Sequence, residues 1–431
     1  MRVAVVGAGV TGSAFTWRFL GGKTKSMGDL GVTIFEMGRG AGGRAGTRHV
    51  RELPKLHVNH GAPLFHVPVA DTETKPLLAA LMASGHLAEW QGRYGSVNAE
   101  TGEQGRAGAS RGETEVGAQG FSRYTGLPSM SAVAKGCLQL AQAGSDSRLE
   151  TCFSVRIKEF KPRREDGMIT GWEIFDKDGK SFGTFDWVVV SGATPALERW
   201  RAGFKEEPPV YAAAQASGSS RFVDRLAELD RPLEYDQTHI VAMAWDVSSG
   251  GADASRIREV LGKLPFDIIQ VQHHEALAKV CVQSLGPDYA VVVLHSTGDF
   301  ARRHIKVKGA GSYVSISNNV EGTVDGEAGV ADTLFKAFLQ VLSHFDTEPL
   351  PHPVWGPSLH RWGAAFPRPV PEPGAPRAWA FPEARFLVAG DFLAPPNACV
   401  AAALRSGLAA GDALLGLLDD LPAKAGARSA L

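Results

Sequence analysis

The sequence has almost no excess of either charge. Its 45 Lys and Arg residues nearly balance its 46 Asp and Glu residues, so the formal net charge is −1 when the histidines are neutral. Proteins that bind nucleic acid owe much of their affinity to the neutralisation of phosphates and usually carry a basic excess or a basic stripe. The sequence has no long run of Lys or Arg, so we do not expect a nucleic-acid partner.

Cysteine is also scarce. The chain has four cysteines, and no two are spaced as a Cys-x-x-Cys pair, so neither a zinc site nor a disulfide framework is expected. The histidines at 57 and 60 and the pair at 273–274 lack a converging set of Cys or carboxylate residues, so we predict no metal site. The cysteines are Cys137, Cys152, Cys281 and Cys399.

Long apolar runs are missing as well. The most apolar stretch, residues 404–418, is interrupted by Arg405 and Asp412 and falls short of the ~18 apolar residues that a membrane span needs. Met1 and Arg2 lead directly into a strand-like run, which leaves no room for a signal peptide. We therefore expect a soluble protein, cytoplasmic by default, although an organellar lumen stays open.

Residues 1–36 have the pattern of a βαβ unit. Residues 2–6 form a β-branched run that ends at Gly7, residues 13–20 follow with helical spacing, and residues 32–35 form a second buried strand closed by Glu36. Further strand-like runs lie at 187–190 and 385–389, and a helix is expected from about 399 to 418. Residues 152–160 and 171–175 predict a hairpin or meander. Elements of one doubly wound domain therefore lie at both ends of the chain.

The middle of the chain differs in kind. Residues 239–245 and 290–294 carry alternating apolar runs typical of an antiparallel sheet, and residues 332–344 have apolar positions at helical spacing. We expect loops at 98–120 and 367–376. The predicted fold class is α/β plus α+β: a Rossmann-like doubly wound domain with an inserted domain of antiparallel sheet and helices that faces the substrate.

Residues 7–12 carry a GxGxxG motif between the first predicted strand and helix. Glycines there permit a tight turn and let backbone N–H groups approach a pyrophosphate. Glu36 ends the second strand, where an acidic side chain accepts hydrogen bonds from the adenosine ribose and disfavours a 2′-phosphate. The alternative is a solvated glutamate at a strand end. The motif predicts that a dinucleotide binds here.

A second glycine-rich loop, residues 38–44, favours FAD over NAD. It carries Arg39 and Arg44, whose guanidinium groups suit phosphate oxygens. A simple nicotinamide Rossmann domain has no need of such a loop, whereas a longer cofactor does. The alternative is a flexible, solvated loop.

Several segments together resemble a known family. They are GAGVTG at 7–12, FEMGRGAGGR at 35–44, NHGAP at 59–63, RYTGLPSMSA at 123–132, VVLHS at 292–296, HRW at 360–362, and GDFL at 390–393 with RSG at 405–407. In this order they resemble the FAD-dependent flavin amine-oxidase superfamily, and specifically its renalase-like branch. The segments span nearly the whole chain, and the internal ones select the branch.

The resemblance implies a p-hydroxybenzoate-hydroxylase-like FAD domain with non-covalent FAD. It would comprise residues 1–65, 121–205 and 377–431, and the substrate domain would comprise 66–120 and 206–376. Residues 7–12 would bind the pyrophosphate, Arg156 and Ile157 would place backbone groups at the adenine, and Asp391 would accept from the ribityl chain unless it caps the next helix. The implied FAD contacts are Gly7, Gly9, Val10, Thr11, Gly12, Glu36, Met37, Arg39, Gly43, Arg44, His60, Gly61, Ala62, Arg156, Ile157, Gly390, Asp391 and Val400.

The resemblance also implies a reaction. Reduced nicotinamide dinucleotides, particularly the off-pathway dihydro isomers, would be oxidised by hydride transfer to the flavin, with O2 as acceptor and H2O2 as product. A flavin needs little from side chains beyond orientation and shielding, so no catalytic triad is expected. His60, His295 and Trp362 are the candidates for the flavin-facing pocket, although a lone histidine is often only structural. The alternatives are an FAD-dependent amine oxidase or desaturase, and a flavin-binding module without turnover.

Four departures from the family pattern bear on catalysis. Asn59 replaces the usual Asp before His-Gly-Ala, Ser129 and Ala402 stand where glycines are usual, and the loop after Asp391 is longer, through prolines at 395 and 396. Ala402 adds a methyl group where backbone would approach the flavin. We expect these changes to affect the affinity for flavin or its reactivity more than they affect the fold.

Overall fold

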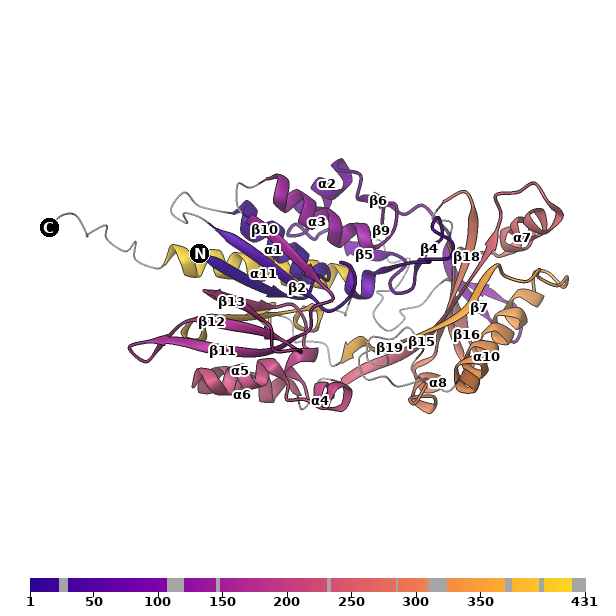
Figure 1. Ribbon diagram of the computed structural model, residues 1–431. Helices are drawn as coiled ribbons and strands as arrows, with labels where there is room; N and C mark the ends of the chain where they lie inside the picture. Colours follow the sequence, from indigo (N-terminus) through magenta and orange to yellow (C-terminus); the bar gives the residue numbers. More distant parts are fainter. Residues whose placement is uncertain are drawn as a thin grey trace.

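The computed structural model describes residues 1–22, 30–106, 120–144, 148–230, 234–283, 286–307, 309, 324–368, 374–394 and 399–420. The molecule is elongated, with a sheet-and-helix half that contains the first strand and the last helix and a second sheet at the opposite end (Figure 1). The chain passes repeatedly between the two halves, because each half is built from segments far apart in the sequence.

The first half is organised around a six-stranded sheet in the order β10-β2-β1-β14-β21-β20. All neighbouring strands are parallel except the last pair, β20 and β21. The order reverses between β1 and β14, which is where doubly wound sheets open a crevice for ligands. The strands are β1 (Arg2–Val6), β2 (Gly31–Glu36), β10 (Arg148–Phe153), β14 (Trp187–Val190), β20 (Ala378–Phe381) and β21 (Phe386–Ala389).

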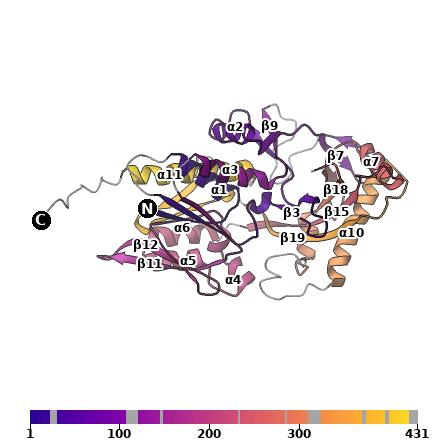
Figure 2. The same cartoon turned by 45° about the horizontal axis from the view of Figure 1, so that its top comes forward.

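Both faces of this sheet are covered, as its continuous apolar strands require. Val3 and Val5 pack under a helical layer, whereas Ala4 faces a layer formed by a β-meander and two helices (Figures 1 and 2). The helical layer consists of α1 (Val10–Gly21), α3 (Ser131–Ala143) and α11 (Val400–Asp419). The other layer consists of β11 (Ile157–Glu165), β12 (Met168–Asp176), β13 (Ser181–Phe185), α5 (Pro209–Ser217) and α6 (Ser220–Asp230).

The second half is a seven-stranded sheet in the order β19-β15-β18-β17-β16-β7-β8. Neighbours are antiparallel except β16 and β7. The strands are β7 (Tyr94–Asn98), β8 (Gln104–Gly105), β15 (Glu234–Asp246), β16 (Ile268–Gln272), β17 (Leu277–Gln283), β18 (Tyr289–Ser296) and β19 (Trp355–Arg368).

Side chains of β15 alternate between two cores. Val241 and Met243 face the helices on the outer side, whereas Ile240 and Ala242 face the first half, where they pack with Val58. The outer helices are α7 (Ala252–Lys263), α8 (Gly298–Arg303) and α10 (Val324–Ser343). The other α-helices and strands of the described residues are α2 (Lys75–Ala83), α4 (Arg199–Phe204), β3 (Thr47–His49), β4 (His57–Asn59), β5 (Phe65–Pro68), β6 (Leu87–Glu89) and β9 (Phe121–Gly126).

The architecture confirms the predicted fold class, and it corrects two local expectations. Residues 152–160 are not one arm of a hairpin: β10 ends at Phe153, a turn at Ser154 with φ of 60° follows, and the meander begins at Ile157. Residues 98–120 are not wholly a loop, because β8 lies within them; residues 107–119 lie outside the described part. The prolines at 395 and 396 also lie outside it.

Helix α11 is long and apolar enough to cross a membrane by composition alone. In the structure, however, 72% of its most apolar window is buried against the rest of the protein. It packs directly on α1, and glycines at the crossing allow the close approach: a Cβ on Gly407 would collide with the carbonyl oxygen of Thr11. This helix therefore serves as a core element of the first half.

The α1–α11 crossing gives a stability prediction. Gly407→Ala should lower the free energy of unfolding by about 1–3 kcal/mol, because the methyl group meets backbone that cannot move aside. Gly416→Ala on the same helix is the matched control: its Cβ would meet nothing within 4 Å, and higher helix propensity should raise stability by up to about 1 kcal/mol. Chemical denaturation of both variants checks this. Equal effects of the two substitutions would contradict it.

Candidate functional site

A cavity of about 420 Å³ lies where the first sheet reverses its strand order and faces the second sheet. Of the predicted site residues, Gly7, Gly9, Val10, Thr11, Glu36, Gly43, Arg44, Gly61, Ala62, His295, Trp362, Asp391 and Val400 line it. Among the described residues, the predicted ones that do not line it are Gly12, Met37, Arg39, His60, Arg156, Ile157 and Gly390. The structure thus brings together residues from both ends and the middle of the chain.

The glycine turn after β1 forms one wall of the cavity. Gly7 has φ of 106°, a conformation that favours glycine. A Cβ on Gly9 would meet no protein atom within 4 Å, so that side of the turn is open, whereas a Cβ on Gly12 would collide with the carbonyl of Gly7. Gly12 therefore lets the helix approach the turn, and it is Gly9 that leaves room for a ligand.

The N-terminus of α1 points into the same space. Its N-cap is Gly9, which has no capping side chain, and no acidic residue lies in the first turn. The first N–H groups of a helix have no partner within the helix, and together with the helix dipole they attract an anion. The second glycine loop is joined to this turn by a hydrogen bond from Gly42 N to Ala8 O of 2.9 Å. The two loops form a cradle that suits a pyrophosphate.

Glu36 lines the cavity beside this cradle. Its carboxylate accepts hydrogen bonds from the N–H groups of Ala8 at 2.8 Å and Gly38 at 2.6 Å. Burial raises the pKa of Glu36, and these two backbone donors partly offset the effect. A carboxylate offers about four acceptor sites, so it retains capacity for ribose hydroxyls. Glu36 is thus not a solvated strand-end residue; it fixes both glycine loops.

Arg44 and Asp391 meet across the cavity from opposite ends of the chain. The guanidinium Nη2 lies 2.6 Å from Oδ1 of Asp391, and Nη1 donates to the carbonyl of Ala365 on β19 at 2.9 Å. Asp391 does not cap α11, because the N-cap there is Cys399, whose Sγ accepts from Ala402 N at 3.4 Å. The pair therefore ties the second glycine loop to the carboxyl end of β21 and to the second sheet.

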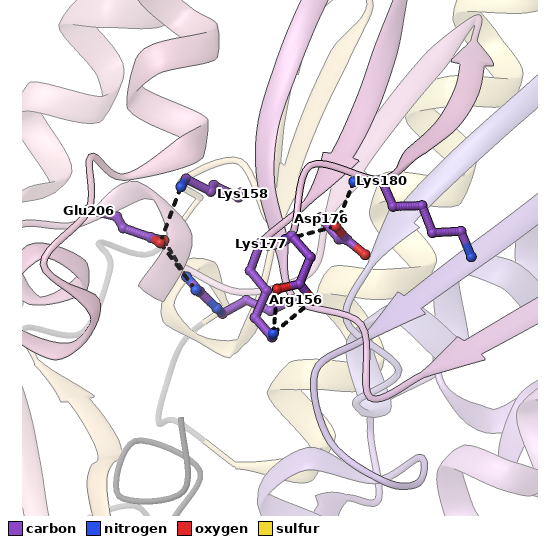
Figure 3. A network of polar contacts seen from close by, with 7 residues as sticks. Arg156, Lys158, Asp176, Lys177, Lys180 and Glu206 are labelled. Carbon is purple, nitrogen blue, oxygen red and sulfur yellow. Dashed lines mark hydrogen bonds and ion pairs between the residues drawn. The ribbon is translucent and has the colours of Figure 1, made fainter. Parts of the chain in front are cut away.

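Arg156 does not line the cavity, and its side chain belongs to the polar network drawn in Figure 3. It forms a bidentate ion pair with Glu206, which Lys158 also approaches at 3.5 Å, and it stacks over the ring of Phe204 at 4.5 Å. Burial alone would raise the pKa of Glu206, but the hydrogen bond and charge of Arg156 outweigh it and lower the pKa. The carbonyl of Arg156 accepts from Lys177 N at 2.9 Å. Arg156 thus links the meander to the segment after α4.

His295 and Trp362 reach the cavity from the second sheet, whereas His60 lies behind Trp362. The His60 ring stacks on the Trp362 ring with centroids 5.4 Å apart. The backbone carbonyl of His60 accepts a hydrogen bond from the indole Nε1 of Trp362 at 2.7 Å. His360 meets His60 edge-on at 5.0 Å. Burial lowers the pKa of His60 to about 4, and burial together with His60 lowers the pKa of His360 to about 3. Both imidazoles are therefore neutral near pH 7.

Sequence reasoning missed several lining residues, including Thr238, Ile240, Lys279 and Arg405. Ile240 and Lys279 both pair with His295 in neighbouring strands, which puts all three on one face of the sheet. The sequence feature that could have indicated this part of the site is Lys279, a single lysine within an apolar strand. Arg405 was noted as an interruption of an apolar stretch and as part of the RSG segment, but not as a lining residue; it is buried and forms an ion pair with Asp71 at 2.7 Å.

The family departures have local explanations. Asn59 is buried, and its Oδ1 accepts from Thr47 Oγ1 at 2.8 Å and from Met130 N at 3.1 Å. Ser129 joins the same group through Thr47 at 3.0 Å. Ala402 is fully buried and is not among the described residues that line the cavity. Its methyl group therefore does not face the cavity.

Comparison with known proteins agrees with the first half of the structure. Residues 5–81 match the family model described as a NAD(P)-binding Rossmann-like domain. That stretch begins at the end of β1 and includes α1, β2, Glu36 and both glycine loops. The match confirms a dinucleotide-binding Rossmann-like unit and supports an oxidoreductase; FAD and the renalase-like branch stay predictions. No curated protein matches the sequence.

Solved structures resemble the chain in fold. A Pyrococcus furiosus protein designated PF1083 has a TM-score of 0.52 and 11% identity, over 97% of this chain and 98% of that one. The Diels-Alderase PyrE3 of pyrroindomycin biosynthesis has a TM-score of 0.43 and 13% identity, over 91% of this chain but 59% of its own length. FqzB has a TM-score of 0.43 and 12% identity, over 92% and 70%. The first of these likenesses supports the two-part architecture.

The position of Glu36 gives a prediction about cofactor retention. Glu36→Gln keeps the shape of the side chain but loses charge-assisted acceptance, and should weaken retention of the expected FAD by about tenfold to a hundredfold. The ratio of flavin to protein absorbance after gel filtration measures this, with circular dichroism to show that the fold is retained. Glu159→Gln, an exposed carboxylate on β11, is the control. Unchanged flavin occupancy in Glu36→Gln would refute the ribose role.

The pair between Asp71 and Arg405 gives a prediction about pH. Burial alone would raise the pKa of Asp71, but the hydrogen bond and charge of Arg405 outweigh it and lower the pKa. Asp71→Asn should lower the free energy of unfolding by about 3–5 kcal/mol near neutral pH, because it leaves Arg405 buried without its counter-charge. The folded-state pKa is below 3.8, so this stabilisation is present above that pH and is lost as the pH falls through the folded value.

Urea unfolding of the wild type and Asp71→Asn at several pH values tests this, and the difference should shrink below about pH 4. Asp412→Asn is the control, since its pair with Arg18 is exposed and should contribute less than about 1 kcal/mol. A difference that persisted unchanged in strong acid would contradict the assignment.

Proposed function

We propose that this protein is an FAD-dependent oxidoreductase of the renalase-like kind, which oxidises reduced nicotinamide dinucleotides, including their dihydro isomers, and uses O2 as acceptor. The carrying observation is one cavity that joins the pyrophosphate cradle to a wall formed by the rings of His295 and Trp362 on the second sheet. A ligand that fills it can place phosphates at α1 and a reacting ring against His295 and Trp362.

The residues fit FAD on several independent grounds. Gly9 leaves open space where its Cβ would stand, and the N-terminus of α1 supplies N–H donors there. Glu36 offers acceptors for ribose hydroxyls, and Asp391 is buried where the ribityl chain would pass. The second glycine loop lines the cavity too, which a nicotinamide cofactor alone does not require. FAD, when bound, would accept a hydride and return the electrons to O2 as H2O2.

The side chains at the second sheet position and shield the substrate. Trp362 presents a flat apolar wall, held in place by its hydrogen bond to the His60 carbonyl and by stacking on the His60 ring. Both carboxylates among the described lining residues, Glu36 and Asp391, already accept hydrogen bonds at the cofactor end. Hydride transfer needs no general base, so this arrangement favours it over chemistry that starts with deprotonation by a carboxylate.

The proposed function gives a prediction about reduction of the flavin. Purified protein should absorb near ~450 nm, and anaerobic mixing with 2-, 4- or 6-dihydro forms of NAD(P) should bleach that band. In air the same substrates should give one H2O2 for each molecule oxidised. Amines are the comparison: bleaching by amines alone would favour an amine oxidase, and bleaching by neither would favour a binding module.

His295→Gln serves as a mechanistic control. It keeps hydrogen-bonding capacity in the cavity wall but removes the imidazole. Loss of a general base typically costs 10²- to 10⁴-fold, so the rate constant for reduction should fall less than about tenfold if no base is needed. A loss in the general-base range would contradict direct hydride transfer.

A further inference from the structure

Gln283 joins the second sheet to the segment that carries His60. It is the last residue of β17, and it is 7% exposed. Its side-chain Nε2 donates to the carbonyl oxygen of Asn59 at 2.9 Å, and its Oε1 accepts from the N–H of Asn59 at 3.1 Å. The carboxamide therefore pairs with the Asn59 backbone as a neighbouring strand would. This requires a side chain that both donates and accepts.

The segment held by this carboxamide also borders the cavity. Asn59 is followed by His60, and then by Gly61 and Ala62, which both line the cavity. The far end of the segment is tied to the second glycine loop, because Ala62 N donates to the carbonyl of Arg44 at 3.0 Å. A Cβ on Gly61 would lie 1.9 Å from the same oxygen, so the two chains touch there. The segment is thus held at both ends, by the carboxamide and by the glycine loop.

His60 connects this segment to the wall of the cavity. Its carbonyl accepts from Trp362 Nε1 at 2.7 Å, and its ring stacks on the Trp362 ring. His360 meets the other side of this arrangement, with its ring centroid 4.6 Å from that of Trp362. Both imidazoles are neutral near pH 7, so packing and one hydrogen bond, rather than charge, hold the indole. A displacement of His60 would therefore displace the face that Trp362 presents to the cavity.

We propose that Gln283 is a positioning residue for the substrate. It does not line the cavity, but it fixes the Asn59 backbone and, through His60, the plane of Trp362 against which the reacting ring lies. The effect on turnover rests on the proposed function, whereas the structural link from Gln283 to Trp362 does not. Hydride transfer needs the reacting carbon at a defined distance and angle, and a displacement of about 1 Å can lower a rate about a hundredfold.

Gln283→Glu tests this link and provides its own rescue. At pH 8 the introduced carboxylate accepts from the Asn59 N–H but cannot donate to the Asn59 carbonyl, so one of the two hydrogen bonds is lost. A protonated carboxyl group donates and accepts again. Burial raises the pKa of such a group, so recovery is expected as the pH falls to about 5.5. His60 and His360 stay neutral over this range, because burial lowers their pKa values to about 4 and about 3.

A spectroscopic measurement follows the wall without turnover. In holoenzyme labelled with 5-fluorotryptophan, the ¹⁹F resonance of Trp362 is identified by its absence in Trp362→Phe. Gln283→Glu should shift this resonance at pH 8 and restore it near pH 5.5. The Trp172 resonance is the internal reference and should not move, since its indole donates to a carbonyl in the core of the first half. Gln340→Glu, on α10, is the matched control and should leave both resonances as in the wild type.

Gln283→Met is a second variant that introduces no buried charge. It keeps the length of the side chain but loses both hydrogen bonds, so it should shift the Trp362 resonance at both pH values without rescue. It carries the test alone if Gln283→Glu does not fold at pH 8. A Trp362 resonance that keeps its wild-type position in Gln283→Met would overturn the inference.

Kinetics test the consequence for the substrate. In anaerobic stopped-flow with a dihydronicotinamide, Gln283→Glu should lower the limiting rate constant of flavin reduction about tenfold to a hundredfold at pH 8, at unchanged flavin occupancy. The rate constant should return towards that of the wild type near pH 5.5. In a Trp362→Phe background the same substitution should have little further effect, because both changes act through one wall.

The two readouts separate this inference from the proposed function. If the Trp362 resonance shifts and recovers but no dihydronicotinamide bleaches the flavin, the proposed function is wrong and the link from Gln283 to Trp362 stands. If dihydronicotinamides bleach the flavin but the resonance does not move, the inference is wrong and the proposed function stands. Kinetic losses that add fully to those of Trp362→Phe would also overturn the inference.

Discussion

The turn after the carboxyl end of β1 has to leave space for a ligand. Hydrogen bonds from the surrounding segments hold the turn in the conformation that leaves this space. Ser191, which follows β14, donates to the carbonyls of Val6 and Gly7, each at 3.0 Å. Glu36, which ends β2, accepts from Ala8, and the second glycine loop donates to the Ala8 carbonyl. Backbone N–H and C=O groups that would otherwise need hydrogen bonds to water therefore have partners within the protein. The rest of the cavity is arranged around this point.

The second half of the molecule is attached to that point by directional contacts as well as by packing. Arg44 reaches β19 through the Ala365 carbonyl, Trp362 donates to the His60 carbonyl, and Gln283 exchanges two hydrogen bonds with the backbone of Asn59. Hydrogen bonds of this kind fix distance and orientation, which burial of apolar surface does not. The wall that faces the substrate is thus held in register with the cradle that faces the phosphates.

Much of the first half could be predicted because its signals are local. Within the first 36 residues, the apolar run at 2–6 predicts a strand, the glycines after it predict a turn, and Glu36 is predicted to end the second strand. The structure has the strand and the turn at these positions, and Glu36 ends β2 and lines the cavity. The meander was misjudged at its start, since one residue with positive φ at Ser154 separates two strands of different sheets. Apolar alternation alone does not reveal such a break.

The substrate wall was harder to predict because it depends on register between distant strands. Lys279 and His295 become neighbours only through the pairing of β17 with β18, and Asp71 meets Arg405 across 334 residues. Arg156 pairs with Glu206, which lies on a segment whose position no local pattern indicates. Ion pairs between residues this far apart produce no periodic pattern in a single sequence, so they could not be predicted from it.

The packing of α11 has a consequence for synthesis on the ribosome. The strand β1 is made before β21 and α11, which complete the same sheet and helical layer and follow almost 400 residues later. Until then the apolar face of α1 that receives α11 remains exposed, including the groove over Thr11 and Ala14 into which Gly407 fits. Early segments with exposed apolar faces are prone to aggregate or to bind chaperones. The nascent chain therefore carries an incomplete cofactor domain through most of its translation.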